Sequence, residues 1–92
     1  MLEISADNSE SFSTDELSAP AGTVTVTFDN QEDGVTHNWA LYPSPDELDN
    51  QIAATELITG PATDSVTFTV EPGEYYFRCD VHPQMEGTFT AE

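Results

Sequence analysis

The sequence predicts an all-β fold, an antiparallel β-sandwich. Apolar and polar residues alternate over several short segments, which is typical of strands that bury one face and expose the other. Turn sequences rich in Pro, Gly and acidic residues separate these segments at intervals of about ten residues. No segment repeats another and no linker interrupts the pattern, so we expect a single domain over residues 1–92.

The first third of the chain contains the most regular of these patterns. Leu2–Ser5 alternates and predicts a short first strand, whereas residues 8–15 are mostly polar. Ala19–Gly22 has the composition of a turn. Thr23–Asp29 then predicts a half-buried strand, because every second residue is a large apolar one. Its buried face is expected to consist of Val24, Val26 and Phe28.

The middle of the chain predicts one strand and one irregular segment. Thr36–Tyr42 is expected to be a strand that Pro43 and Pro45 end. Acidic residues then follow a serine, as at the start of a helix, so a short helix or a turn is expected around residues 46–54. The core-facing side of the strand is predicted to carry His37, Trp39 and Leu41.

Three more strands are predicted before the chain ends. Asp64–Val70 alternates cleanly, and Glu71–Glu74 is a tight turn that contains Pro and Gly. The strand after this turn has bulky apolar residues at every second position, and Thr88–Thr90 forms the last strand. The core face of the strand after the turn is predicted to carry Tyr75, Phe77 and Cys79.

The chain is strongly acidic, with 18 Asp and Glu residues, a single Lys or Arg and a net charge of -17. Phosphates repel such a chain, so nucleic acid and anionic membranes are not expected partners. It also lacks the long apolar run of a membrane-spanning segment. Two explanations of the charge remain open: a docking surface for a basic partner, or a general acidic surface as in proteins adapted to high salt.

The candidate functional residues cluster near the end of the chain. The one Cys excludes an internal disulfide and any metal site built on two Cys residues. Cys79, His82 and Met85 lie within seven positions, and their sulfur and imidazole groups suit a soft transition metal, copper above all. His37 is the second His, and like Cys79 it is expected to face the core near one end of a strand. Two such strand ends can meet at the top of a sandwich.

The resulting donor set indicates one mononuclear copper site. Two imidazoles and a thiolate, with a thioether as a weak axial ligand, form the blue-copper set. Zinc would accept the first three donors but gains little from a thioether. His82 and Met85 are expected in a loop that folds back over the strand ends, with Gly87 allowing the turn into the last strand. The alternative for Met85 is a core side chain beside a site of three ligands.

The sequence resembles the cupredoxin family, in particular its small plastocyanin- and amicyanin-like blue (type 1) copper proteins. The resemblance rests on a His-Asn pair at residues 37–38 and on two consecutive patterns, Gly-x-Tyr-x-Phe-x-Cys and Cys-x-x-His-Pro-x-Met-x-Gly, over residues 73–87. Phe12, Leu17 and residues 20–22 also resemble the early strands of that family. The short spacing between His82 and Met85 is similar to that of the family members with shorter loops.

The resemblance implies a Greek-key sandwich and a role for each site residue. His37, Cys79 and His82 would be the strong copper ligands and Met85 the axial one. Asn38 would tie the two ligand segments together, with its backbone N–H directed at the Cys sulfur.

The resemblance further implies one-electron transfer by Cu(I)/Cu(II) cycling between redox partner proteins. These partners would dock near His82, on apolar neighbours formed by Val81, Pro83 and Met85. The alternative function is a copper carrier or storage protein without a redox role. We expect a monomer. We do not expect an enzyme, because both His residues are committed to the copper site. The implied location is extracytoplasmic, in the periplasm or at the cell surface, either free or as the soluble domain of an anchored protein.

Overall fold

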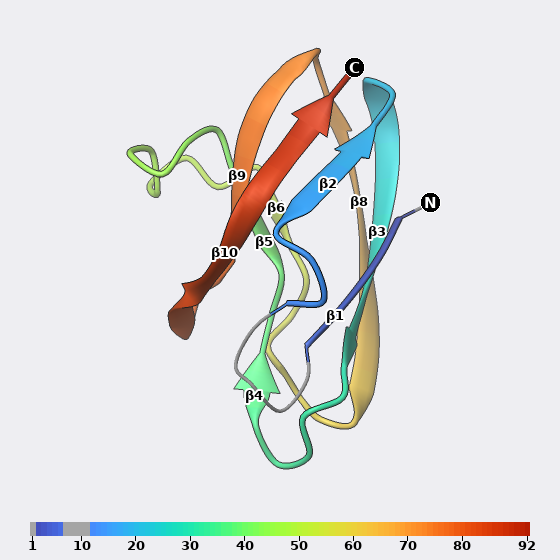
Figure 1. Cartoon of the computed structure of the whole chain (residues 1–92), viewed down its shortest axis with the longest axis vertical. Coiled ribbons are helices and arrows are strands. Elements are labelled where there is room, and N and C mark those ends of the chain that lie inside the picture. The colour runs from blue at the N-terminus through green and yellow to red at the C-terminus, as the bar shows by residue number, and fades with distance from the viewer. Residues whose placement is uncertain (1, 7–11) are drawn as a thin grey trace.

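The protein folds as two facing β-sheets with a small third sheet at one end, in a computed structural model that describes residues 2–6 and 12–92 (Figure 1). The first sheet has the order β1 (Leu2–Ala6), β3 (Gly22–Asn30) and β8 (Ala62–Val70). The second has the order β2 (Glu16–Ala19), β10 (His82–Ala91), β9 (Gly73–Cys79), β5 (Ala40–Tyr42) and β6 (Ala53–Ala54). The small sheet pairs β4 (Thr36–His37) with β7 (Ile58–Thr59).

This architecture confirms the predicted all-β sandwich. The strands expected in the first third of the chain and around residues 64–79 and 88–90 are present. Residues 8–11, half of the polar segment expected at residues 8–15, lie outside the described residues. No helix in the described part of the chain is long and apolar enough to cross a membrane.

The segment around residues 46–54 forms turns, and no helix occurs there. The backbone N–H groups of Glu47 and Asn50 donate to carbonyl oxygens three residues earlier, each at 3.1 Å. A short helix depends on packing an apolar face against the protein. Here the large apolar residues of the segment, Leu48 and Ile52, are 39% and 36% exposed, so a helix would not be stabilised by packing. Of the two expectations for this segment, the turn is correct.

Two strand pairings differ from the antiparallel expectation. β1 pairs with β3 in parallel, and β10 pairs with β2 in parallel. The chain leaves the first sheet after β1, forms β2 in the second sheet and returns as β3. Neighbours joined through the opposite sheet are not hairpins, so nothing constrains them to run in opposite directions. The remaining pairs within the two sheets are antiparallel.

The expected strand over residues 36–42 is divided between two sheets. β4 pairs with β7, whereas β5 pairs with β9 and β6. Between them, Trp39 donates its backbone N–H to the Thr55 hydroxyl and accepts a bond from the Thr55 N–H, each at 2.9 Å. The prediction of one continuous strand was wrong because residues 37–42 are buried on both sides, so the alternation no longer marks a solvent face.

Aromatic side chains from both sheets fill the core. Trp39 stacks on Phe68 of β8 at 5.9 Å between ring centroids and lies 5.7 Å from Phe77 of β9. Phe68 in turn meets Phe89 of β10 edge to face at 5.8 Å. Such contacts stabilise beyond the burial of apolar area. The core face predicted for Phe77 and Cys79 is confirmed, since both are 0% exposed.

On the outer face of the first sheet, hydroxyl groups pair across β3 and β8. Thr25 pairs with Thr67 across the strands at 2.9 Å, and Thr27 pairs with Ser65 at 3.0 Å. Cross-strand pairs of this kind stabilise a sheet, and they fit the alternation that predicted both strands.

Gly87 lies inside β10, and the expectation that it forms the turn into the last strand was wrong. A Cβ atom at this position would collide with the carbonyl oxygen of Asp15 and with the ring of Phe77. The glycine therefore allows β10 to approach the segment before β2 while Phe77 stays in the core.

We predict that Gly87→Ala lowers the free energy of unfolding by about 1–3 kcal/mol, because the added methyl group forces backbone or ring to move. The measurement is denaturant-induced unfolding of the metal-free protein. Thr88→Ala is the matched control, since Thr88 is the next residue and is exposed. It should cost at most about 0.5 kcal/mol. Equal losses for the two variants would contradict the close approach at Gly87.

Candidate metal centre

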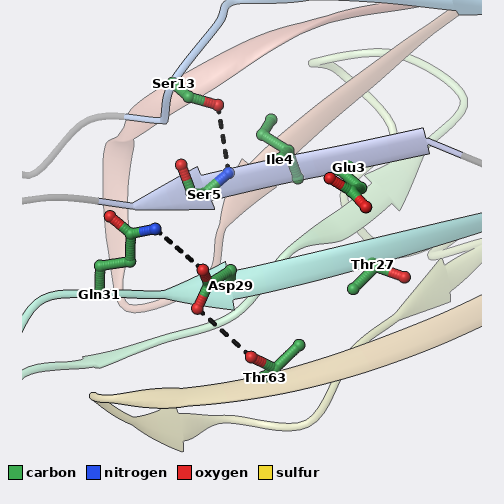
Figure 2. Close-up of a pocket in the computed structure, with 8 residues that line it drawn as sticks. All are labelled: Glu3, Ile4, Ser5, Ser13, Thr27, Asp29, Gln31 and Thr63. Atoms are coloured by element: carbon green, nitrogen blue, oxygen red, sulfur yellow. Dashed lines mark hydrogen bonds between the residues drawn. The ribbon is translucent and has the colours of Figure 1, made fainter.

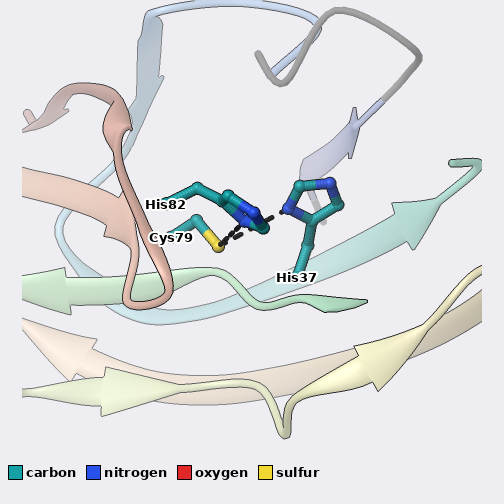
Figure 3. Close-up of side chains that lie close together, drawn as sticks. All are labelled: His37, Cys79 and His82. Carbon is teal, nitrogen blue, oxygen red and sulfur yellow. Dashed lines mark hydrogen bonds between the residues drawn. The ribbon is translucent and has the colours of Figure 1, made fainter. Parts of the chain in front are cut away.

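Three side chains with metal-binding atoms converge at one end of the sandwich (Figure 3). The Sγ atom of Cys79 lies 3.6 Å from Nδ1 of His37 and 3.7 Å from Nδ1 of His82. The ligand atoms of the three residues all lie within 4.8 Å of one another. The two imidazole rings are 4.6 Å apart between centroids.

Each of the three residues stands at the end of a strand. His37 is the last residue of β4, Cys79 the last of β9 and His82 the first of β10. His82 is the register partner of Cys79, so a two-residue connection brings it back beside the thiol. The alternation that placed Phe77 in the core also turns Cys79 inward.

The segment after His82 is a strand with an irregularity, not the loop that the sequence suggested. The register of β10 against β9 shifts between His82 and Glu86. Such a break frees a few residues from the ladder and redirects their side chains. Met85 lies within it, is 1% exposed and belongs to the same buried cluster as Cys79.

Burial differs among the donors. His37 and Cys79 are 0% exposed, whereas His82 is partly exposed. Val81, the residue that directly precedes His82, is 48% exposed. Solvent and other molecules therefore reach this cluster from the side of His82.

The donor spacing fits a bound metal ion. Bond lengths of about 2.0–2.1 Å to nitrogen and 2.3 Å to sulfur, at angles between tetrahedral and trigonal, place the two atoms about 3.5–3.8 Å apart. Both sulfur–nitrogen distances, 3.6 and 3.7 Å, lie in this range. A thiolate with two imidazoles suits copper, and a buried thioether nearby favours copper over zinc. The types of donor and both sulfur–nitrogen distances therefore fit a copper ion.

Glu32 makes a contact that the sequence did not reveal. Its Oε1 lies 2.7 Å from Nε2 of His37, the ring nitrogen opposite to the one that faces Cys79. The Glu32 side chain is only 14% exposed. It is one of 18 acidic residues in the chain. Among so many acids, the sequence contains no signal that would single out this one.

Asn38 joins the two segments that carry His37 and Cys79. Its Oδ1 accepts the backbone N–H of Asp80 at 2.8 Å, and its Nδ2 donates to the Asp80 carboxylate at 3.0 Å. Asn38 is 3% exposed, so these bonds are largely shielded from water. The hydrogen bond from the Asn38 backbone to the Cys79 sulfur, which the resemblance implies, stays a prediction.

The Asp80 carboxylate is the centre of a wider network. It accepts the hydroxyl of Tyr42, the Nε–H of Arg78 at 3.3 Å and the amide of Gln51 at 3.4 Å. Burial raises the pKa of Tyr42, and the hydrogen bond to the anionic Asp80 raises it further. The Arg78 guanidinium also lies 5.3 Å from the centre of the Tyr42 ring. These contacts fix the residue that directly follows Cys79.

A separate pocket lies on the outer face of the first sheet (Figure 2). Its polar groups bond to one another: Asp29 accepts from Gln31 at 2.9 Å and from Thr63 at 3.3 Å, and the Ser5 N–H donates to the Ser13 hydroxyl at 3.1 Å. The Asp29–Thr63 bond joins β3 to β8, and the Ser5–Ser13 bond joins β1 to the segment before β2. The residues that line this pocket form no group of metal-binding side chains like that at Cys79.

Comparison with known proteins identifies the family. The profile of the cupredoxin-like domain matches residues 2–91. The chain belongs to the cupredoxin-like domain family. No curated protein sequence matches it. The family expected from the residue patterns is therefore confirmed over nearly the whole chain.

Solved structures share this cupredoxin-like fold. Auracyanin A of the green thermophilic photosynthetic bacterium Chloroflexus aurantiacus, a "blue" copper protein, is 28% identical, with a TM-score of 0.87 over 99% of this chain and 97% of its own. Dithionite-reduced auracyanin of Roseiflexus castenholzii is 26% identical, with a TM-score of 0.87 over 99% and 95% of the two chains. An azurin of Methylomonas sp. strain J, 22% identical, has the same fold, with a TM-score of 0.82 over 98% and 95%.

We predict that Asn38→Ala lowers the free energy of unfolding by about 1–3 kcal/mol, because it leaves the partly buried N–H of Asp80 without its acceptor. Urea unfolding of the metal-free protein measures the loss. Asn50→Ala, in the exposed turn, is the control and should change stability by no more than about 0.5 kcal/mol. The bridging role is refuted if the two variants are equally stable.

Proposed function

We propose that this cupredoxin-like domain is a blue copper electron-transfer protein. The observation that carries the proposal is the convergence of His37, Cys79 and His82, with sulfur–nitrogen distances that already fit a metal ion. The family membership and the likeness to auracyanins support the same function. The bound copper supplies a one-electron Cu(II)/Cu(I) couple.

We assign the ligand roles as follows. Nδ1 of His37, Sγ of Cys79 and Nδ1 of His82 would hold the copper strongly, and the thioether of Met85 would be a fourth, weaker ligand. The first three assignments rest on the distances between the donor atoms. The fourth rests on the burial of Met85 in the cluster that contains Cys79.

The protein contributes rigidity and exclusion of water. The Asn38–Asp80 bonds and the aromatic core beneath Cys79 hold the donors in place whether or not an electron has been transferred. Donors that do not move add little to the reorganisation that accompanies electron transfer. Burial of His37 and Cys79 keeps water from competing for the metal.

Electrons enter and leave through His82, the partly exposed donor. A redox partner protein docks there against Val81. Met85 was expected to contribute to this docking surface, but at 1% exposure it does not reach the surface. An enzymatic role is not favoured, because both His residues of the chain are needed for the copper site. The resemblance to extracytoplasmic copper proteins supports a place in the periplasm or at the cell surface.

The deciding measurement is the visible and EPR spectrum of the protein after one equivalent of Cu(II) is added. We expect the intense blue charge-transfer band of a copper–thiolate bond, and its reversible loss on one-electron reduction. Cys79→Ser should abolish the band even where copper stays bound. A protein that binds copper but stays colourless would refute the electron-transfer site and favour copper carriage or storage.

We also predict that charge steers the redox reactions of this protein. With a net charge of -17, the reduced protein should be oxidised faster by a tripositive cobalt(III) complex at low salt than at high salt. Ferricyanide should show the opposite dependence, because salt screens its repulsion. Stopped-flow rates over a series of ionic strengths test this, and rates that do not vary with salt would contradict steering of basic partners.

A further inference from the structure

We propose that Glu32 is a positioning residue that sets the reduction potential of the copper site through His37. The inference rests on the proposed function, since it concerns the balance between the two copper oxidation states. It concerns a residue outside the ligand set.

The contact determines which nitrogen of His37 is available. Nε2 of His37 lies 2.7 Å from the Glu32 carboxylate, and a carboxylate can only accept a hydrogen bond, so the ring carries its proton on Nε2. In a neutral ring of this tautomer the lone pair lies on Nδ1, the atom that faces the Cys79 sulfur at 3.6 Å. A His that ligates a metal commonly donates its other N–H to such a partner, which fixes its tautomer and orientation.

Glu32 is held by its backbone as well as by its side chain. Its N–H donates to Oδ1 of Asn30 at 3.0 Å, and its carbonyl accepts the N–H of Val35 at 3.1 Å. Asn30 is 0% exposed, and its Nδ2 donates to the carbonyls of Val35 and Ile58, both at 2.8 Å. Ile58 is the register partner of His37 in the small sheet. One buried amide thus fixes the turn of Glu32 relative to the strand of His37.

The chain before β8 closes the other side of this turn. Gly60 accepts the N–H of Gly34 at 3.0 Å and donates its own N–H to Val35 at 3.1 Å. A Cβ atom on Gly60 would lie 2.8 Å from the carbonyl carbon of Glu32, closer than real Cβ atoms approach. Glycine at this position therefore allows the two segments to touch. The Glu32 carboxylate is fixed against His37 and does not sample the surface freely.

The charge of Glu32 favours the more highly charged metal ion. The imidazole that it contacts is 0% exposed, so the interaction is only weakly screened by water. A hydrogen bond from the ring N–H to a carboxylate also makes the imidazole a more basic, stronger metal ligand. Both effects stabilise Cu(II) more than Cu(I), and Glu32 therefore lowers the reduction potential. A purely structural Glu32 would change stability but leave the ratio of the two affinities unchanged.

The test compares Glu32→Gln with Asp33→Asn. The first keeps an acceptor oxygen but removes the charge beside His37, and the second removes the same charge from the exposed next residue. For Glu32→Gln we expect the Cu(II) affinity to fall about 10–100-fold and the Cu(I) affinity to fall less. Each tenfold difference between the two losses raises the potential by about 59 mV. Competition with chelators and a redox titration measure both quantities.

A second readout uses the metal-free protein. In the ¹⁵N-resolved NMR spectrum, His37 should carry a slowly exchanging proton on Nε2, and Glu32→Ala should make that proton exchange rapidly. If the metal-free ring carries its proton on Nδ1, or if Glu32→Gln and Asp33→Asn have the same potential, the proposal is overturned. A wild-type protein that lacks the blue band refutes the proposed function instead, so the two failures are distinguishable.

Discussion

The pair of hydrogen bonds between Asn38 and Asp80 is the constraint on which the metal centre depends. His37 belongs to the small sheet and Cys79 to the second sheet, and the backbone ladder between them stops at Asn38 and Trp39. The Asn38 amide bridges that gap with bonds of 2.8 and 3.0 Å to Asp80. Side-chain bonds therefore replace the backbone ladder where the strand must leave one sheet for another.

One buried polar group in the core beneath the site has no hydrogen-bond partner, whereas a buried amide near the metal-binding side chains is fully hydrogen-bonded. In the described part of the chain, the indole Nε1 of Trp39 is buried without a hydrogen-bond partner. Its ring is held by contacts with Phe68 and Phe77, and Phe77 lies two residues before Cys79. By contrast, buried Asn30 makes three hydrogen bonds. An unpaired donor beside a ligand would introduce alternative arrangements, and the satisfied network prevents them.

Period-two alternation predicted much of the fold, and it placed Cys79 on the core face of β9. It failed between Thr36 and Tyr42, because that segment is covered on both faces and the pattern then no longer reports where a strand ends. Gly87 was misread as a turn residue because sequence does not reveal that the Phe77 ring fills the space of its missing side chain. Glu32 was unpredictable, since its role depends on a contact five residues away and not on a motif.

The two kinds of negative charge in this protein act on different quantities. Surface acids contribute to a net charge of -17, but salt screens them beyond about 8 Å at physiological ionic strength. They govern how often a charged partner arrives. The Glu32 carboxylate contacts a fully buried imidazole through a 2.7 Å hydrogen bond, so salt weakens its influence far less. Substitution of surface acids can therefore adapt the protein to a different partner or salinity. Such changes leave the Glu32 carboxylate in place, and with it the proposed control of the reduction potential.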